Sequence, residues 1–132
     1  MALAVGLSEV NVANKLLDGL TKTGTYPAAG GIYVQLHTDI PGSAGTASVA
    51  AASTRYLATM GSISGGSVSL SSMASSWTIS AGETISHISL WTASTAGTFL
   101  WSGALSSTKT VSSGDTFALT TLTLAFTPIA TT

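Results

Sequence analysis

The sequence predicts an all-β fold, an antiparallel β-sandwich (immunoglobulin-like or jelly-roll-like) with one short N-terminal helix. Short segments of alternating apolar and polar residues recur from residue 31 onward, which is typical of strands that bury one face. Glycine- and proline-containing turns separate these segments about every 8–12 residues, as in sandwiches and small barrels. Long helices between the strands are absent from the pattern, which argues against a parallel α/β sheet.

Residues 8–21 predict the helix. Ser8 is a suitable N-cap because its hydroxyl can accept a hydrogen bond from a free amide of the first turn. Glu9 follows where the helix dipole favours an anion. The apolar residues of this segment share the spacing of one helical face: Val10, Ala13, Leu16, Leu17 and Leu20. Gly24 and Pro27 prevent the helix from continuing.

Residues 1–7 precede this helix and are predicted to form an N-terminal arm, while residues 8–132 form a single domain. Leu3, Val5 and Leu7 alternate with small residues in the arm. Such a segment can add as a strand to the sheet edge of a neighbouring protein. The alternative is a frayed terminus.

The first strand is predicted at residues 31–38, with Val34 and Leu36 on one face and Gln35 and His37 on the other. Pro41-Gly42 ends it. Six further strands, about 54–60, 67–70, 76–79, 84–92, 98–102 and 116–127, follow from the same alternation. A loop of small residues at 43–53 and a hairpin loop at 94–97 separate some of them.

The chain carries unusually little charge. Charged residues make up 7% of its 132 residues and the net charge is -1, whereas soluble domains average about 25% charged residues. Serine and threonine, 21 of each, supply the polarity instead. Four cations are too few for nucleic-acid binding, and no apolar run approaches the roughly 18 residues of a membrane span. Because charge keeps proteins apart, this composition favours a subunit of an assembly.

Candidate catalytic and metal-binding groups are few. His37 and Asp39 have the spacing of a base and its orienting group, but a strand end followed by a turn explains them better. His37 and His87 could bind a metal together with Asp39 or Glu83 only if their strands pair. A histidine packed on a sheet face explains His87 better. The chain has no cysteine, so zinc–thiolate sites are excluded. We therefore predict no catalytic residue, no metal site and no cofactor.

Three tryptophans, Trp77, Trp91 and Trp101, could form a platform for carbohydrate, but a core or subunit-interface cluster explains them better. The residues predicted to contact partners combine these aromatics with the arm and one loop residue: Leu3, Val5, Leu7, Ile40, Trp77, Trp91 and Trp101.

Residues Tyr33–Gly42, followed by Gly45-Thr46, form a YVxLHTxxPGxxGT pattern. This pattern resembles a signature of small structural proteins of tailed bacteriophages, which are described as minor capsid, decoration or tail-fibre-like proteins. Four later blocks are similar to the same family: residues 85–91, 97–100, 103–105 and 114–117. The resemblance implies a part of the virion without enzyme activity. Ile40 departs from the pattern, which has a charged or polar residue before Pro41, and this change is either a contact surface or without consequence.

The resemblance and the low charge together predict a capsid decoration or minor capsid protein that stabilises a phage head. Its partners would be the major capsid protein and copies of itself, for example in a trimer, with no nucleic acid and no membrane, after assembly in the host cytoplasm. The alternative is a minor tail or tail-fibre protein that contacts the host surface. Two further alternatives stay open: a free carbohydrate-binding module that uses the tryptophans, and a hydrolase that uses His37 and Asp39.

Overall fold

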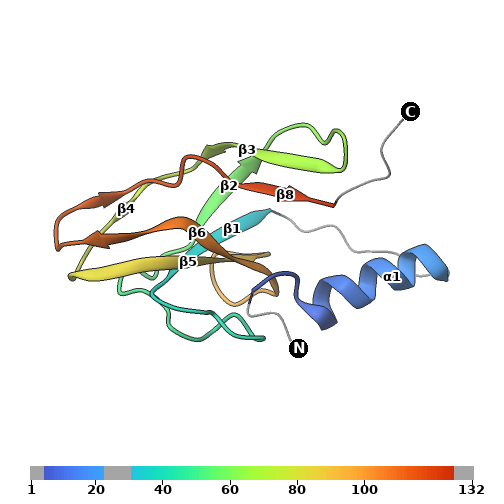
Figure 1. Ribbon diagram of the computed structural model, residues 1–132, viewed down its shortest axis with the longest axis horizontal. Coiled ribbons are helices and arrows are strands. Elements are labelled where there is room, and N and C mark those ends of the chain that lie inside the picture. Colours follow the sequence, from blue (N-terminus) through green and yellow to red (C-terminus); the bar gives the residue numbers. More distant parts are fainter. Residues whose placement is uncertain (1–4, 23–30, 127–132) are drawn as a thin grey trace.

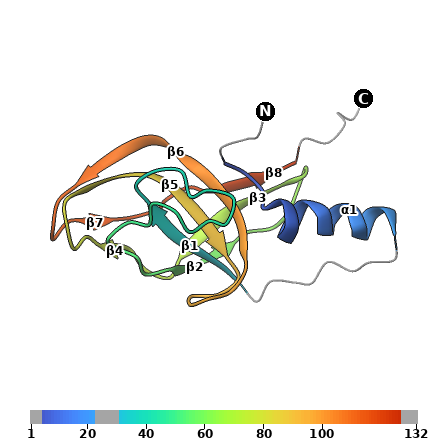
Figure 2. The ribbon, with the colours of Figure 1, turned by 90° about the horizontal axis from the view of Figure 1, so that it is seen from below.

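The computed structural model describes residues 5–22 and 31–126 (Figures 1 and 2). A π-helical segment, Glu9–Ala13, continues into α1 (Asn14–Thr21). Eight strands follow: β1 (Ile32–His37), β2 (Tyr56–Met60), β3 (Ser67–Met73), β4 (Trp77–Thr78), β5 (Glu83–Trp91), β6 (Phe99–Val111), β7 (Thr116–Phe117) and β8 (Thr123–Ala125). The predicted all-β class with one N-terminal helix is confirmed. Within the described residues, neither helical segment is long and apolar enough to cross a membrane.

The strands form two antiparallel sheets. The larger one is curled and has the order β6-β5-β1-β2-β3-β8, and the smaller one pairs β4 with β7. Figure 2 shows β4 and β7 together at the end of the molecule away from α1. Side chains of the small sheet pack into the same core as those of β1 and β5. The two sheets therefore enclose the core as the two layers of a sandwich.

Trp77 of β4 lies at the centre of this core, with 1% of its surface exposed. Its ring meets those of Tyr56 and Phe117 edge-on, at centroid distances of 5.3 and 6.1 Å. Its indole Nε1 donates to the Thr54 carbonyl at 2.7 Å. Trp77 thus joins the small sheet to the large one through packing and a satisfied polar group.

The first predicted strand is confirmed, but residues 34–37 are all buried, so neither face is open to solvent. The loop that follows β1 explains this difference, because it folds back over the second face. The Ala50 amide donates to the Leu36 carbonyl at 3.0 Å, and the Gln35 side chain donates to the Ser53 carbonyl at 3.1 Å. This loop supplies hydrogen-bond partners for the polar side chains that the alternation predicts to be exposed to solvent.

Two predicted strands have different boundaries. The segment 116–127 was predicted as one strand, which is wrong: β7 pairs with β4 in the small sheet, while β8 pairs with β3 in the large one. The chain crosses from the small sheet to the large one between β7 and β8, and the strand is interrupted there. The strand predicted at 98–102 is too short, since β6 continues to Val111 and pairs Thr110 with Thr84. Its second half is rich in serine and threonine and therefore lacks the apolar alternation that marks a strand.

The predicted helix is confirmed, including its cap. The Ser8 hydroxyl accepts from the Asn11 amide at 3.3 Å. The Ser8 carbonyl accepts from both Val12 and Ala13 amides at 3.0 Å, which widens the first turn into the π form. Val12 is buried, and the Asn11 side chain donates to the Phe99 carbonyl at 3.0 Å. None of the side chains of α1 is buried, and the helix projects from the body (Figure 1).

The described part of the arm pairs with the body of its own chain. The Ser102 amide donates to the Gly6 carbonyl, and the Ser8 amide to the Leu100 carbonyl, both at 2.8 Å. Gly6 and Leu7 therefore extend their own sheet along β6, whereas the sequence left open addition to a neighbour's sheet and a frayed terminus. The reason is proximity, because the helix anchor at Val12 places the arm beside this edge. Leu3 lies outside the described residues.

Candidate functional site

His37 is the centre of a buried polar network. None of its surface is exposed. Its Nδ1 lies 2.7 Å from the Ala47 carbonyl and its Nε2 lies 2.7 Å from the Ser89 hydroxyl. Because a carbonyl can only accept, Nδ1 carries the proton and Nε2 accepts from Ser89. The Ser89 hydroxyl in turn accepts from the Trp91 Nε1 at 2.7 Å. Burial lowers the pKa of His37, so the neutral ring is the form that this network holds.

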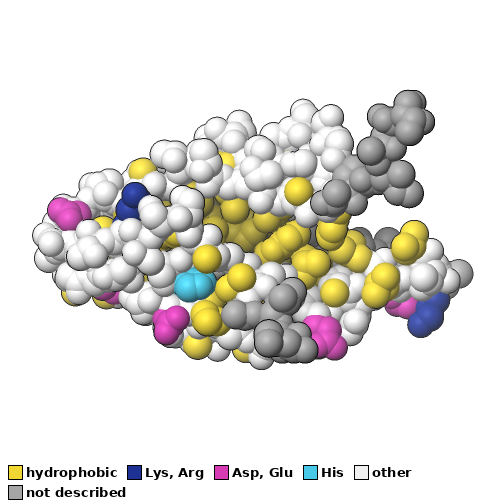
Figure 3. All heavy atoms as spheres, in the orientation of Figure 1, with side chains coloured by type: hydrophobic (Ala, Val, Ile, Leu, Met, Phe, Trp, Pro, Cys, Tyr) yellow, Lys and Arg dark blue, Asp and Glu magenta, His cyan; other side chains and the backbone are white. Residues whose placement is uncertain are grey.

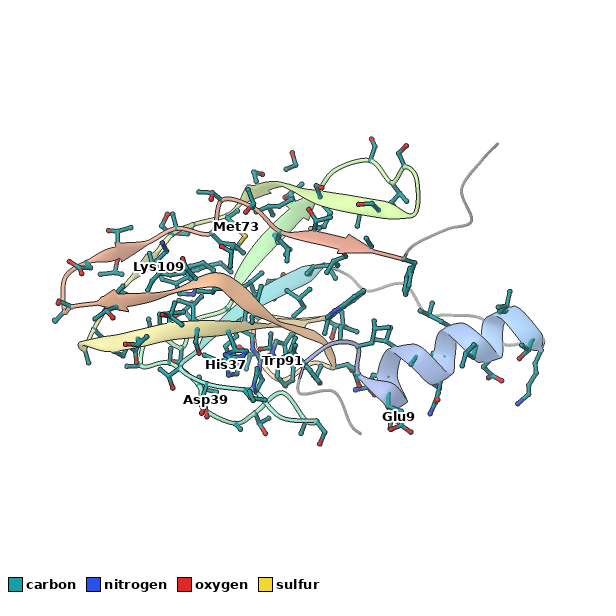
Figure 4. The ribbon with its side chains drawn as sticks, in the orientation of Figure 1. Glu9, His37, Asp39, Met73, Trp91 and Lys109 are labelled. Carbon is teal, nitrogen blue, oxygen red and sulfur yellow. The ribbon has the colours of Figure 1, made fainter. Side chains whose placement is uncertain are left out.

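Arg55 covers the outer side of the same cluster. Its guanidinium carbon lies 3.8 Å from the centroid of the Trp91 ring, a cation–π geometry. The same group donates to the Ala96 carbonyl at 2.6 Å and to the Gln35 side chain at 3.3 Å. Figure 4 shows His37 and Trp91 close together beside β5. The cluster therefore ties β1, β5 and the 92–98 hairpin into one unit.

The loop after β1 is closed by the residues of the YVxLHTxxPGxxGT pattern. The Pro41 carbonyl accepts from the Ala47 amide at 2.9 Å, and the Gly42 carbonyl accepts from the Gly45 amide at 3.1 Å. Gly45 has φ +73°, and a Cβ on it would lie 2.5 Å from the Phe99 ring. Glycine is required there for both conformation and space. The pattern thus describes a loop fixed onto its own sheet.

The hydrolase hypothesis pairs His37 with Asp39, and the structure does not bring the two together. Asp39 is exposed, and its carboxylate accepts from the Ile40 amide at 2.8 Å. Its side chain therefore holds the turn, and the nitrogens of His37 are occupied by Ala47 and Ser89. The Ser89–His37 pair itself is buried, so no substrate atom can reach it.

The metal hypothesis requires β1 and β5 to pair, and they do, with His37 opposite His87. The remaining ligands do not converge. Both Glu83 carboxylate oxygens accept from the Ala51 amide, at 2.9 and 3.1 Å. No group of three or more metal-ligating side chains occurs within the described residues.

The predicted contact residues divide by exposure. Trp77 is in the core, and Trp91 is 6% exposed beneath Arg55, which leaves these two side chains no surface for a partner or a sugar. Trp101 is half-buried on β6 and pairs with Leu7 of the arm. Val5 is half-buried as well, and Ile40 is 40% exposed in the loop after β1.

A cleft of about 460 Å³ lies between β6 and the segment that leads into β8. These are the two edge strands of the large sheet, so the cleft marks where the curled sheet does not close. Four partly buried leucines line it: Leu105, Leu119, Leu122 and Leu124. Lys109 is its one charged lining residue. Figure 3 shows hydrophobic side chains in this hollow and along the projecting helix.

Sequence reasoning missed this cleft. The leucines of residues 117–124 are visible as an apolar alternation, which predicts one strand and says nothing of a cleft. Trp101 was the one predicted contact residue that lines the cleft. The signal that could have indicated the cleft is this apolar segment, for which the sequence predicts no pairing partner.

The comparisons with known proteins agree with the resemblance to phage structural proteins. The model of a protein family described as podophage GP4 fiber I protein gp80 matches residues 6–127. No curated protein matches the chain.

Proposed function

The chain belongs to the podophage GP4 fiber I protein gp80 family, and on this premise we propose that it is a non-enzymatic structural component of a phage fibre or tail. The observation that carries the proposal is the extent of the match. It spans the arm from Gly6, the helix and all eight strands. The family favours the fibre alternative over the decoration of a head shell, which the sequence had placed first.

The use of the ionisable side chains supports a structural role. Glu83 binds the Ala51 amide, Asp115 binds the Ser112 amide, and Asp39 binds the Ile40 amide. His37 is neutral and enclosed. Catalytic acids and bases need access to substrate, whereas these groups fix loops.

The composition of the surface supports a role as a subunit of a larger assembly. It carries few charges, and several large apolar side chains are exposed, among them Leu20 at 80% and Leu17 at 57%. Exposed apolar side chains that gather in one place commonly mark contact sites. A fibre subunit would bury part of this surface against its neighbours.

The number of copies per particle tests the proposal. Quantitative mass spectrometry of purified particles, with the major capsid protein as internal reference, would give that number. We expect few copies relative to the major capsid protein, and immunogold label at the fibre or tail. A number comparable to the major capsid protein would favour shell decoration instead. Absence from the particles would exclude both positions in the virion.

A role in host attachment is part of the proposal and has its own test. Purified chain, added before the phage, should reduce the rate of adsorption to host cells if it carries the host-binding surface. Unchanged adsorption at saturating protein would assign the chain to the framework of the fibre.

A further inference from the structure

The segment Glu9–Ala13 and α1 together present an apolar face that the described residues of the chain leave exposed. The exposed fractions along it are 67% for Val10, 37% for Leu16, 57% for Leu17 and 80% for Leu20. The polar residues of the segment include Glu9, Lys15 and Asp18. An amphipathic surface helix normally buries such a stripe. A helix of this length is also marginal in water without a packing partner.

The cleft between β6 and the segment before β8 is the matching feature on the body. Its lining leucines are only partly buried, and its volume of about 460 Å³ lies within the roughly 300–1,000 Å³ of clefts that hold ligands. Apolar residues share its lining with serines and threonines, and Lys109 is the one charged residue. An apolar side-chain stripe therefore fits it better than a charged partner.

The two features match in length and do not meet within the described residues (Figure 1). Residues 9–21 form a rod of about 20 Å, and the cleft follows β6 from Trp101 to Lys109, about 25 Å of strand. The helix starts at the Trp101 end of the cleft, where Leu7 pairs with Trp101. From there it points away from the body (Figure 1).

We propose that the cleft between β6 and β8 is the docking site for helix α1 of a second copy of this chain. The apolar side chains of the helix and of the cleft appear in the same view of the surface (Figure 3). Two copies can therefore exchange helices about a two-fold axis, each filling the other's cleft. Two such contacts bury on the order of 1,000–1,400 Å², near the lower end of stable interfaces. This inference goes beyond the proposed place in the virion and holds for the purified protein.

Oligomeric state is the first test. Full-length chain is compared with Leu17→Asp, which alters the helix face, and with Gly103→Trp, which fills the cleft from a lining position where a Cβ meets nothing within 4 Å. Ile63→Asp is the control. Sedimentation should show association of the wild type and the control, and monomers for the other two, with the β-sheet signal in circular dichroism retained. A monomeric wild type in the millimolar range, or association that survives either change, would overturn the proposal.

Cross-linking identifies the two surfaces directly. The chain has no cysteine, so each introduced thiol is unique. A Leu17→Cys chain mixed with a Ser106→Cys chain should give a mixed dimer with a short bismaleimide, and a mixture with Ile63→Cys should not. Dimers of Leu17→Cys alone as the main product would show helix–helix pairing and refute the docking site. The copy number in particles tests the proposed function separately, so either idea can fail without the other.

Discussion

The strands of the β-sandwich and the N-terminal helix both gather apolar residues on one face, by alternation in the strands and by helical spacing in the helix, with opposite results. In the sandwich, Leu36, Ile85 and Leu90 are at most 2% exposed. In the helix, Leu17 and Leu20 are more than half exposed. Periodicity therefore decides which residues share a face, but only a partner decides whether that face is buried. Within the described residues, the sandwich buries its own apolar face, whereas the apolar face of the helix stays exposed.

The polar groups of the two regions differ in the same way. Within the described residues, no buried side-chain polar atom lacks a hydrogen-bond partner, and the His37 network is fully internal. The helix is held to the body at its first turn alone, by the Ser8 backbone, the Asn11 side chain and buried Val12. Substitutions in the sandwich should consequently change folding stability, and those beyond the first helical turn should change association.

The largest expected effect is the loss of the central tryptophan. Trp77→Ala should lower the free energy of unfolding by about 3–5 kcal/mol, since it opens a large cavity and leaves the Thr54 carbonyl without its donor. Urea unfolding followed by circular dichroism measures this. Trp101→Ala, at a half-buried position, should cost clearly less. Equal losses would contradict the central place given to Trp77.

The second effect concerns the loop that covers His37. Gly45→Ala should destabilise the chain by about 1–3 kcal/mol, because a Cβ would meet the Phe99 ring and φ is positive. Gly65→Ala is the control, since its φ is also positive but a Cβ there meets nothing within 4 Å. The difference in unfolding midpoint isolates the contact with Phe99. Similar midpoints would mean that the loop moves aside at no cost.

The third effect is a pH dependence that belongs to the sandwich. The pKa of His37 is lowered by burial, from an ordinary value of 6.5. As the pH falls, the unfolded chain takes up this proton before the folded chain does, so the free energy of unfolding decreases below about pH 6.5. Above that pH the contribution is constant. Urea midpoints at several pH values should show this decrease for the wild type.

His37→Gln is the comparison for the pH series. The variant should be less stable at neutral pH, because it does not reproduce both ring contacts, and its midpoint should vary less between pH 5 and 7. The same slope in both proteins would assign the pH dependence to other groups.

The smallest expected effect lies in the helix. Leu20→Ser should change the unfolding free energy of the sandwich by no more than about 0.5 kcal/mol, since its side chain is exposed. Val12→Ala, one buried residue of the same helical segment, should cost about 1 kcal/mol or more. These are measured at dilutions where the chain is monomeric. A large loss for Leu20→Ser would mean that the helix packs on its own sandwich.

The sequence predicted the elements with the clearest local signals. Ser8 as cap, the helix and the strand around Val34 follow from neighbours a few residues away, and the structure confirms them. The assignment of residues 116–127 failed because both halves alternate equally well. Nothing local says that Thr116 pairs in the small sheet and Leu124 in the large one.

The candidate sites show the same limit. The preference for a structural His37 over a catalytic one follows from the turn that comes after it. Its actual partner Ser89 is 52 residues away in the chain and could not be named from the sequence. The cleft was missed because it depends on two edge strands that fail to pair, and an absent pairing leaves no local trace.

By itself, the sequence determined most of the segments that form strands or helix, the low charge of the chain and its resemblance to phage structural proteins. Tertiary structure alone decided the strand order, the enclosure of His37, the exposure of the helix face and the open edge beside β6. The physical reason is the separation along the sequence of the residues that interact. Hydrogen bonds and side-chain spacing within a few residues set the local conformation, whereas burial depends on which distant segments meet.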